Sequence, residues 1–139
     1  MHEHFHQWVY SQPWWRQELY KPQASSPEQV LANSVRSWSS RNLNDAVQLA
    51  HTWQDHDISK TRGFDGNIEH ALSAIKIPVL YMPGATDLYF PQTDAEYEKA
   101  FLSSVKFVPI PSVWGHTAGG GGNPTDAAFI NKEVAAFLR

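Results

Sequence analysis

The sequence contains no cysteine, and this absence removes several kinds of chemistry at once. Disulfide bonds, thiolate metal sites and a cysteine nucleophile are all excluded. The chain also lacks any run of lysine or arginine, and its formal net charge is -3. A surface that binds DNA or RNA needs a basic stripe to neutralise phosphates, so nucleic-acid binding is not expected.

Long apolar stretches are missing as well. A membrane-spanning helix needs roughly 20 consecutive apolar residues, and no stretch of the chain approaches that length. The first twenty residues hold three histidines and many aromatic rings, but no apolar segment typical of a secretory signal. We therefore expect a cytoplasmic protein without a membrane partner.

Aromatic rings are concentrated at the start of the chain. The 139 residues suffice for one domain with its own core, and 42% hydrophobic against 18% charged residues is a globular balance. Six of the eighteen aromatic residues lie within the first twenty positions, namely Phe5, Trp8, Tyr10, Trp14, Trp15 and Tyr20. A segment so rich in rings has to bury them against another part of the chain.

The first half of the sequence has the spacing of helices. Phe5, Trp8 and Val9 fall on one helical face, and Pro13 should end or kink that helix. The next start is clearer, because Ser26 suits an N-cap and Pro27 suits the first helical position. The apolar face of this helix holds Val30, Leu31, Val35 and Trp38.

A further helix is predicted over residues 43–53. Its apolar side holds Leu43, Ala46, Val47, Ala50 and Trp53. A short helical stretch over 67–75 then leads into the second half. A shift in composition near Gly66 predicts two parts, a helical cap-like segment at 1–66 and an α/β segment at 67–139.

Two strands are predicted in the second half. Residues 77–82 form a short apolar run without alternation, which is typical of a strand buried on both faces of a parallel sheet. Residues 105–110 form the second strand. The intervening segment over 91–102 predicts a helix, with Tyr97, Ala100 and Phe101 facing inward. A crossover of this length makes the strands parallel and the connection right-handed.

A last helix closes the chain. Thr125 is expected to cap it, and its apolar residues are Phe129, Ile130, Val134, Phe137 and Leu138. The second half thus predicts the order strand, helix, strand, helix.

Asp87 and His116 each follow the carboxyl end of a predicted strand by several residues. Parallel strands point the same way, so both residues should overhang the same edge of the sheet, where ligand sites of open α/β sheets lie. A carboxylate on one nitrogen of an imidazole fixes its tautomer and supports the imidazolium. The positions of these two residues after successive strands therefore predict that Asp87 and His116 form an acid–base pair.

The residues around this pair resemble a known family. The stretch 77–91, IPVLYMPGATDLYFP, is similar to the acid-bearing strand and loop of the homoserine O-acetyltransferase branch of the α/β-hydrolases, where the acid precedes an apolar pair and a proline. Residues 110–116, IPSVWGH, resemble the histidine loop of that branch, and the helices from about 27 to 53 resemble its cap. By this resemblance Asp87 matches the triad acid and His116 the triad base.

The resemblance implies the α/β class, with the C-terminal part of an α/β-hydrolase fold (parallel strand, helix, strand, helix) preceded by a helical cap. It implies acyl transfer in which a serine attacks the donor, His116 moves the proton and Asp87 orients His116. The co-substrate would be acetyl-CoA and the acceptor a hydroxyl amino acid, with no metal and no resident cofactor. A serine esterase or thioesterase of the same fold, or a non-catalytic binding remnant, is the alternative.

Two features depart from the pattern of that branch. No Gly-x-Ser-x-Gly motif occurs, so the nucleophile and the oxyanion-hole segment are missing. Transferases of the branch commonly carry an acidic residue after the histidine, whereas Thr117 stands here. The sequence therefore predicts a fragment that is inactive alone and that associates with a missing N-terminal half or with itself.

Other patterns carry weaker alternatives. A metal site is conceivable at His2, His4 and His6, and another at His51, Asp55, His56 and Asp57, although solvated helix faces are the favoured interpretation. The glycines at 119–122 could cradle a phosphate but lack the lysine of a P-loop. Five tryptophans could line a substrate pocket or fill a core, namely Trp8, Trp14, Trp15, Trp38 and Trp53.

Overall fold

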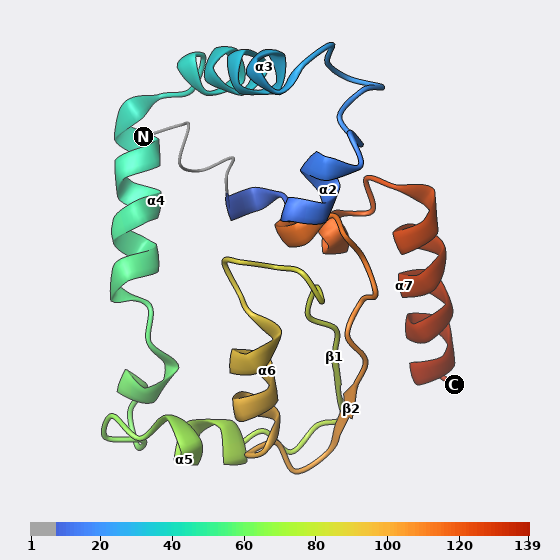
Figure 1. The fold of residues 1–139 in the computed structure, drawn as a ribbon. Helices are drawn as coiled ribbons and strands as arrows, with labels where there is room; N and C mark the ends of the chain where they lie inside the picture. Colours follow the sequence, from blue (N-terminus) through green and yellow to red (C-terminus); the bar gives the residue numbers. More distant parts are fainter. Residues whose placement is uncertain (1–7) are drawn as a thin grey trace.

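The computed structural model describes residues 8–139 (Figure 1). Phe5 of the first predicted helix lies outside the described residues, as do His2, His4 and His6 of the first metal-site alternative. Within residues 8–139, none of the helices has both the length and the apolar character needed to cross a membrane.

Pro13 starts a helix instead of ending one. Helix α2 (Gln12–Arg16) begins at Ser11, whose side chain accepts a hydrogen bond from the backbone N–H of Trp14. The prediction that Pro13 ends or kinks the first helix was wrong, since the helical residues Trp8 and Val9 end before Tyr10. A proline in the first turn of α2 loses no hydrogen bond, because that N–H has no helical partner.

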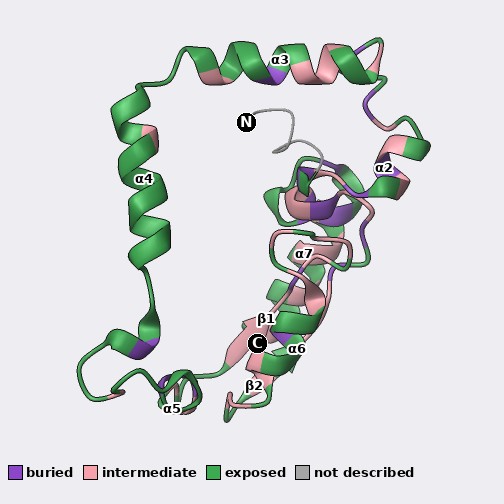
Figure 2. Cartoon of the chain, turned by 60° about the vertical axis from the view of Figure 1, so that its left-hand side comes forward, coloured by how far each residue is buried: buried purple, intermediate pink, exposed green. Residues whose placement is uncertain are grey.

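Helices α3 (Pro27–Ser39) and α4 (Leu43–Asp55) confirm the two predicted helices. Ser26 caps α3 by accepting a hydrogen bond from the N–H of Gln29 at 3.3 Å. In Figures 1 and 2 the two helices form an arm that leads away from the sheet and returns through the 3-10 helix η1 (Ile58–Lys60) and helix α5 (Ile68–Ser73). No residue of α4 is buried.

The sheet has two parallel strands, β1 (Val79–Tyr81) and β2 (Val105–Phe107), as the sequence predicts. Val79 pairs with Val105 and Tyr81 with Phe107. A further parallel bridge joins Gly84 to Ile110 beyond the strand ends. The two chain segments therefore stay side by side up to the loops that follow.

Burial of β1 on both faces was predicted wrongly. All three of its residues are half-buried, and Ile77 just before it is 71% exposed. A two-stranded sheet leaves one edge of each strand without a neighbour among residues 8–139, so the apolar run is only partly covered (Figure 2). An apolar strand of this kind is typical of the interior of a wider parallel sheet.

Helices cover the two faces of the sheet. On one face the hydroxyl of Tyr81 donates to Glu98 of α6 (Gln92–Lys99) at 2.6 Å, and Lys99 lies 4.1 Å from the ring centre of Phe107. On the other face Lys106 pairs with Glu133 of α7 (Pro124–Phe137) at 2.9 Å. The side chains alternate between the faces, as a strand requires.

Two helix details differ from the sequence prediction. Tyr97 is 54% exposed and Ala100 is exposed, whereas Ala95 is the buried residue of α6. Of the three residues predicted to face inward, Phe101 is half-buried and lies just after α6, whereas the other two are exposed. The prediction failed for those two because a short helix with few apolar residues gives a weak periodicity. Asn123, not Thr125, caps α7, since Pro124 takes the first helical position and the cap therefore lies two residues upstream of the predicted one.

The core is aromatic and lies beside the sheet, not within it. Trp14, Tyr20 and Ala24 form its buried centre. Partly buried residues pack around them, namely Tyr10, Trp15, Leu19, Val30 and Trp114. Because Trp114 belongs to the loop after β2, this core connects the first described segment to the end of the sheet.

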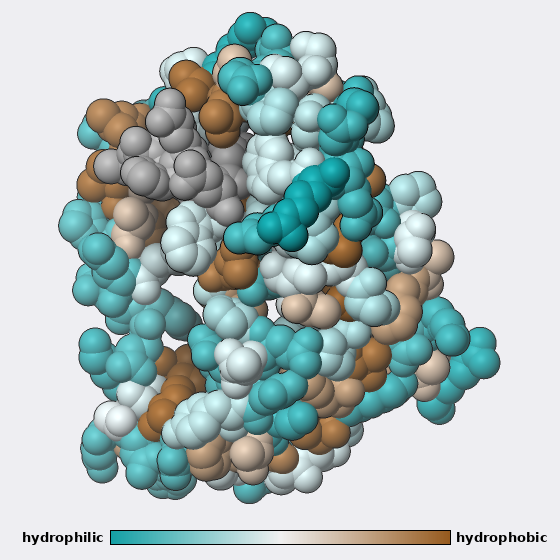
Figure 3. Space-filling model, in the orientation of Figure 1, coloured by the Kyte–Doolittle hydropathy of each residue, from teal (hydrophilic) through white to brown (hydrophobic). Residues whose placement is uncertain are grey.

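Large apolar side chains stay exposed outside this core. On α4 they are Leu43, Val47, Leu49 and Trp53. In Figure 3 brown apolar side chains break the mainly teal surface at several places. Apolar surface of this extent is typical of faces that another chain or domain covers.

We predict that the purified chain self-associates through α4. Leu43 and Val47 lie one turn apart, so replacing both with glutamine should lower the association without breaking the helix. Sedimentation velocity measures the size of the assemblies that the chain forms. Asn44→Gln on the same helix serves as the control and should leave the association unchanged. A wild-type chain that sediments as a monomer and melts in one sharp transition would contradict the prediction.

Candidate active site

Asp87 and His116 meet at the carboxyl edge of the sheet, as the sequence predicts. Asp87 lies in the loop after β1, and His116 lies in the 3-10 helix η2 (Gly115–Gly120) after β2. Nδ1 of His116 is 3.0 Å from Oδ2 of Asp87. An ionised carboxylate only accepts, so Nδ1 carries the proton and donates. Nε2 then remains as the basic nitrogen that can face a reactant.

Exposure differs between the two side chains. The side chain of Asp87 is 9% exposed and that of His116 is 33% exposed. The buried acid is held in place because its Oδ1 accepts from the backbone N–H groups of Tyr89 at 2.8 Å and Phe90 at 3.1 Å. The imidazole is therefore fixed at its inner end and accessible at its outer end.

Thr86 ties the acid loop to the histidine loop. Its hydroxyl donates to the carbonyl oxygen of Ser112 at 2.8 Å and accepts from the N–H of Gly115 at 3.1 Å. These two bonds flank the Asp87–His116 contact in both loops. They set the spacing of the pair through groups that take no part in proton transfer.

Aromatic rings flank the imidazole. The ring centre of Tyr89 lies 5.1 Å from that of His116, and the ring centre of Phe90 lies 5.4 Å from it. Burial, followed by the charge of Asp87, raises the pKa of the Tyr89 hydroxyl, so this ring stays neutral. Phe90 also touches Trp53 of α4 at 6.5 Å between ring centres. The end of the helical arm therefore lies beside the site.

Gly115 packs the histidine loop against the first described segment. Its φ is +59°, and a Cβ there would lie 2.4 Å from the carbonyl oxygen of Val9 and 2.9 Å from the backbone nitrogen of Ser11. Both the conformation and the close approach require glycine. The hydroxyl of Ser11 also donates to the carbonyl oxygen of Val113 at 2.5 Å.

A buried polar group, the carboxylate of Asp126, supports the same loop. Oδ2 of Asp126 accepts from the hydroxyl of Ser112 and from the side-chain amide of Asn123, both at 2.5 Å. The Ser112 hydroxyl in turn accepts from the N–H of Trp114 at 3.1 Å. Sequence reasoning missed Ser11 and Asp126, although Asn123 with an acid three residues later resembles a capping box.

A cavity of about 340 Å³ opens beside the pair. Asp87, Phe90 and His116 line it together with Tyr81 and Glu98. Its volume suits a small molecule. A reactant in this cavity would reach the imidazole directly.

The other candidate residues do not join this site. No three His, Asp or Glu side chains within residues 8–139 are placed to hold a metal ion, which includes the cluster from His51 to Asp57. Gly119 and Gly120 belong to η2, and Gly121 ends it with a φ of +68°. Of the five tryptophans, Trp14 and Trp38 line one cavity, while Trp8 and Trp53 are more than half exposed.

We predict that Gly115→Ala separates His116 from Asp87. A positive φ costs an alanine about 1–2 kcal/mol, and the overlap with Val9 adds to it because a backbone oxygen cannot move aside. Imidazole ¹⁵N NMR should show loss of the single Nδ1-protonated tautomer, and urea unfolding should show lower stability. Gly120→Ala is the matched control, since nothing lies within 4 Å of its Cβ position. Equal spectra for the two variants would contradict this role of Gly115.

Comparison with known proteins shows relatives among esterases. No protein-family model matches the sequence. A probable esterase of Corynebacterium glutamicum is 29% identical over 116 residues, which are 80% of this chain and 33% of that protein. The chain thus spans about a third of the length of this curated relative.

Two solved structures are similar to the whole chain or most of it. The acetyl esterase MekB matches with a TM-score of 0.91 and 22% identity over 99% of this chain and 40% of its own. An acetylester hydrolase from Corynebacterium glutamicum matches with a TM-score of 0.77 and 27% identity over 84% of this chain and 34% of its own. The chain therefore has the fold predicted from its sequence, the C-terminal part of an α/β-hydrolase fold preceded by helices.

Proposed function

We propose that this chain supplies the acid–base pair of a serine esterase that hydrolyses acetyl esters. The observation that carries the proposal is the 3.0 Å contact between His116 Nδ1 and Asp87 Oδ2 at an accessible sheet edge. Nε2 of His116 takes the proton of a serine hydroxyl as it attacks the ester carbonyl, and returns it to the leaving alcohol. Asp87 keeps the ring in the required tautomer and stabilises its charged form.

The relatives support hydrolysis over transfer. One solved relative is described as an acetyl esterase, another as an acetylester hydrolase, and the curated relative as a probable esterase. None of these names indicates transfer from acetyl-CoA to a hydroxyl amino acid, so the homoserine O-acetyltransferase assignment stays a prediction. Thr117 after His116 also fits hydrolysis, because it departs from the transferase pattern.

The nucleophile has to come from outside this sequence. Among residues 8–139, His116 hydrogen-bonds to Asp87 and to no serine, and the sequence has no Gly-x-Ser-x-Gly motif. We propose that residues 1–66 act as the cap and residues 67–139 as the acid–base segment of the complete hydrolase. Serine esterase chemistry of this kind needs neither a metal nor a resident cofactor.

A chimera tests this proposal. This chain would replace the 40% of MekB that it matches, and the rate of p-nitrophenyl acetate hydrolysis would be measured. The chimera should hydrolyse the ester, whereas this chain alone should not. His116→Ala should lower turnover by about 10⁶-fold and Asp87→Asn by about 10⁴-fold, by analogy with other serine hydrolases.

The controls separate chemistry from folding. Asp45→Asn changes an exposed residue in the first turn of α4, at the end of the helix away from Trp53, and it should leave turnover within about twofold. Circular dichroism establishes that each variant is folded. A folded chimera that is inactive, or one in which His116→Ala retains full turnover, would refute the proposal.

A further inference from the structure

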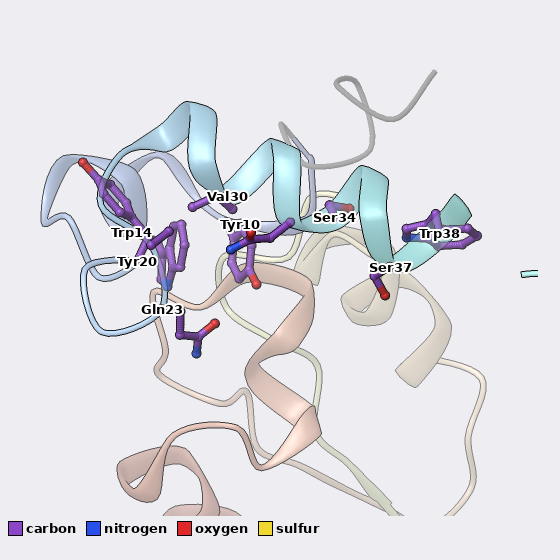
Figure 4. A pocket seen from close by; sticks show the side chains of 10 residues that line it. Tyr10, Trp14, Tyr20, Gln23, Val30, Ser34, Ser37 and Trp38 are labelled. Atoms are coloured by element: carbon purple, nitrogen blue, oxygen red, sulfur yellow. The ribbon is translucent and has the colours of Figure 1, made fainter. Parts of the chain in front are cut away.

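A second cavity lies between the aromatic core and helix α3 (Figure 4). Its volume is about 370 Å³. Tyr10, Trp14 and Tyr20 line it from the first segment, and Ser34 and Trp38 line it from α3. It shares no lining residue with the cavity beside His116, so it is a separate site.

One residue that lines this cavity, Trp14, carries a buried donor without an acceptor. Trp14 is 2% exposed, and its Nε1 is the one buried side-chain nitrogen or oxygen of residues 8–139 without a hydrogen-bond partner. Buried donors are almost always paired, because leaving one unpaired costs its full desolvation. This N–H therefore indicates a partner that is absent from the described chain.

Neighbouring rings pack against the indole of Trp14 on several sides. Its ring stacks on Tyr10 with ring centres 3.8 Å apart and planes 8° apart. Trp15 and Trp114 meet it edge-on at 4.8 Å and 5.9 Å. The donor is thus held in one place, as a recognition group must be.

The lining defines the chemistry of a ligand. None of the ten lining residues carries a charge, which favours a neutral ligand over an ion. Val30 and the aromatic rings suit an apolar body, and the fixed N–H of Trp14 suits an acceptor oxygen. Neutral polar side chains complete the lining, namely Gln23, Asn33, Ser34 and Ser37. The volume is in the range of small-molecule sites.

We propose that this cavity binds a small neutral carbonyl compound whose oxygen accepts a hydrogen bond from Nε1 of Trp14. The site is distinct from the catalytic pair, and the inference does not rest on esterase activity. Trp14 touches Trp114, which lies two residues before His116. A bound ligand therefore contacts the core on which the histidine loop packs.

Two probes of the same shape test the proposal on the full chain. Acetophenone carries a carbonyl oxygen where ethylbenzene carries a methylene group. Ethylbenzene gains more free energy than acetophenone on leaving water for an apolar site. Tighter binding of acetophenone would therefore require a polar contact with the protein. The ¹H–¹⁵N resonances of the six indole groups report binding, and the ketone should shift the Trp14 indole signal in a saturable way, with affinity about tenfold above that of ethylbenzene.

Two variants of α3 identify the place of binding. Ser34→Leu puts a larger side chain into the cavity and should abolish the shift, whereas Ala32→Leu places the same side chain on an exposed position of the same helix and should preserve it. Trp14→Phe should remove the preference for acetophenone, so that the two probes bind with about equal affinity. If Trp14→Phe fails to fold, the comparison of Ser34→Leu with Ala32→Leu still tests whether acetophenone binds in this cavity.

The outcomes are separate from those of the esterase proposal. The assay measures binding and not hydrolysis, and Asp87→Asn should leave it unchanged. An unmoved Trp14 indole signal at saturating acetophenone would overturn the proposal. Equal affinity for ethylbenzene, or binding that persists in Ser34→Leu, would overturn it as well.

Discussion

The parallel pairing of β1 with β2 is the constraint on which the site depends. Both strands end at the same edge, and the bridge from Gly84 to Ile110 keeps the following loops together. Residues 29 positions apart in the chain can then meet, as Asp87 and His116 do. Thr86 fixes the spacing of the two loops through ordinary hydrogen bonds. The acid–base geometry is thus a consequence of sheet topology.

Support for the histidine loop is stronger than support for the rest of the fold. The aromatic core packs against Trp114 of this loop, and the buried Asp126 holds Ser112. In contrast α4 buries no residue and β1 is only half-buried. A well-held pair of Asp87 and His116 beside uncovered apolar faces agrees with our proposal that the chain works as one segment of a larger hydrolase. The chain spans a third to two fifths of the length of the relatives it matches.

The sequence predicted those features that depend on local chemistry and strand order. The cap at Ser26, the parallel strands and the meeting of Asp87 with His116 are confirmed. The predicted burial of β1 was wrong. An apolar run shows that a strand is suited to a buried environment, but it does not show which neighbouring elements are present to cover it. Ser11 went unnoticed because its partner Val113 lies 102 residues away, and no local pattern encodes such a contact. The bond of Asp126 to Ser112 spans 14 residues and was missed for the same reason, although its bond to Asn123 is local.

Labelling of a serine nucleophile tests the central claim most directly. An antibody against residues 125–139 would isolate the endogenous protein after treatment with a fluorophosphonate, which reacts with activated serines. If Asp87 and His116 serve a serine esterase, a labelled serine should appear on the same polypeptide or on one that co-purifies with it. An endogenous product of 15.7 kDa that neither takes up the label nor accompanies a labelled chain would contradict the account.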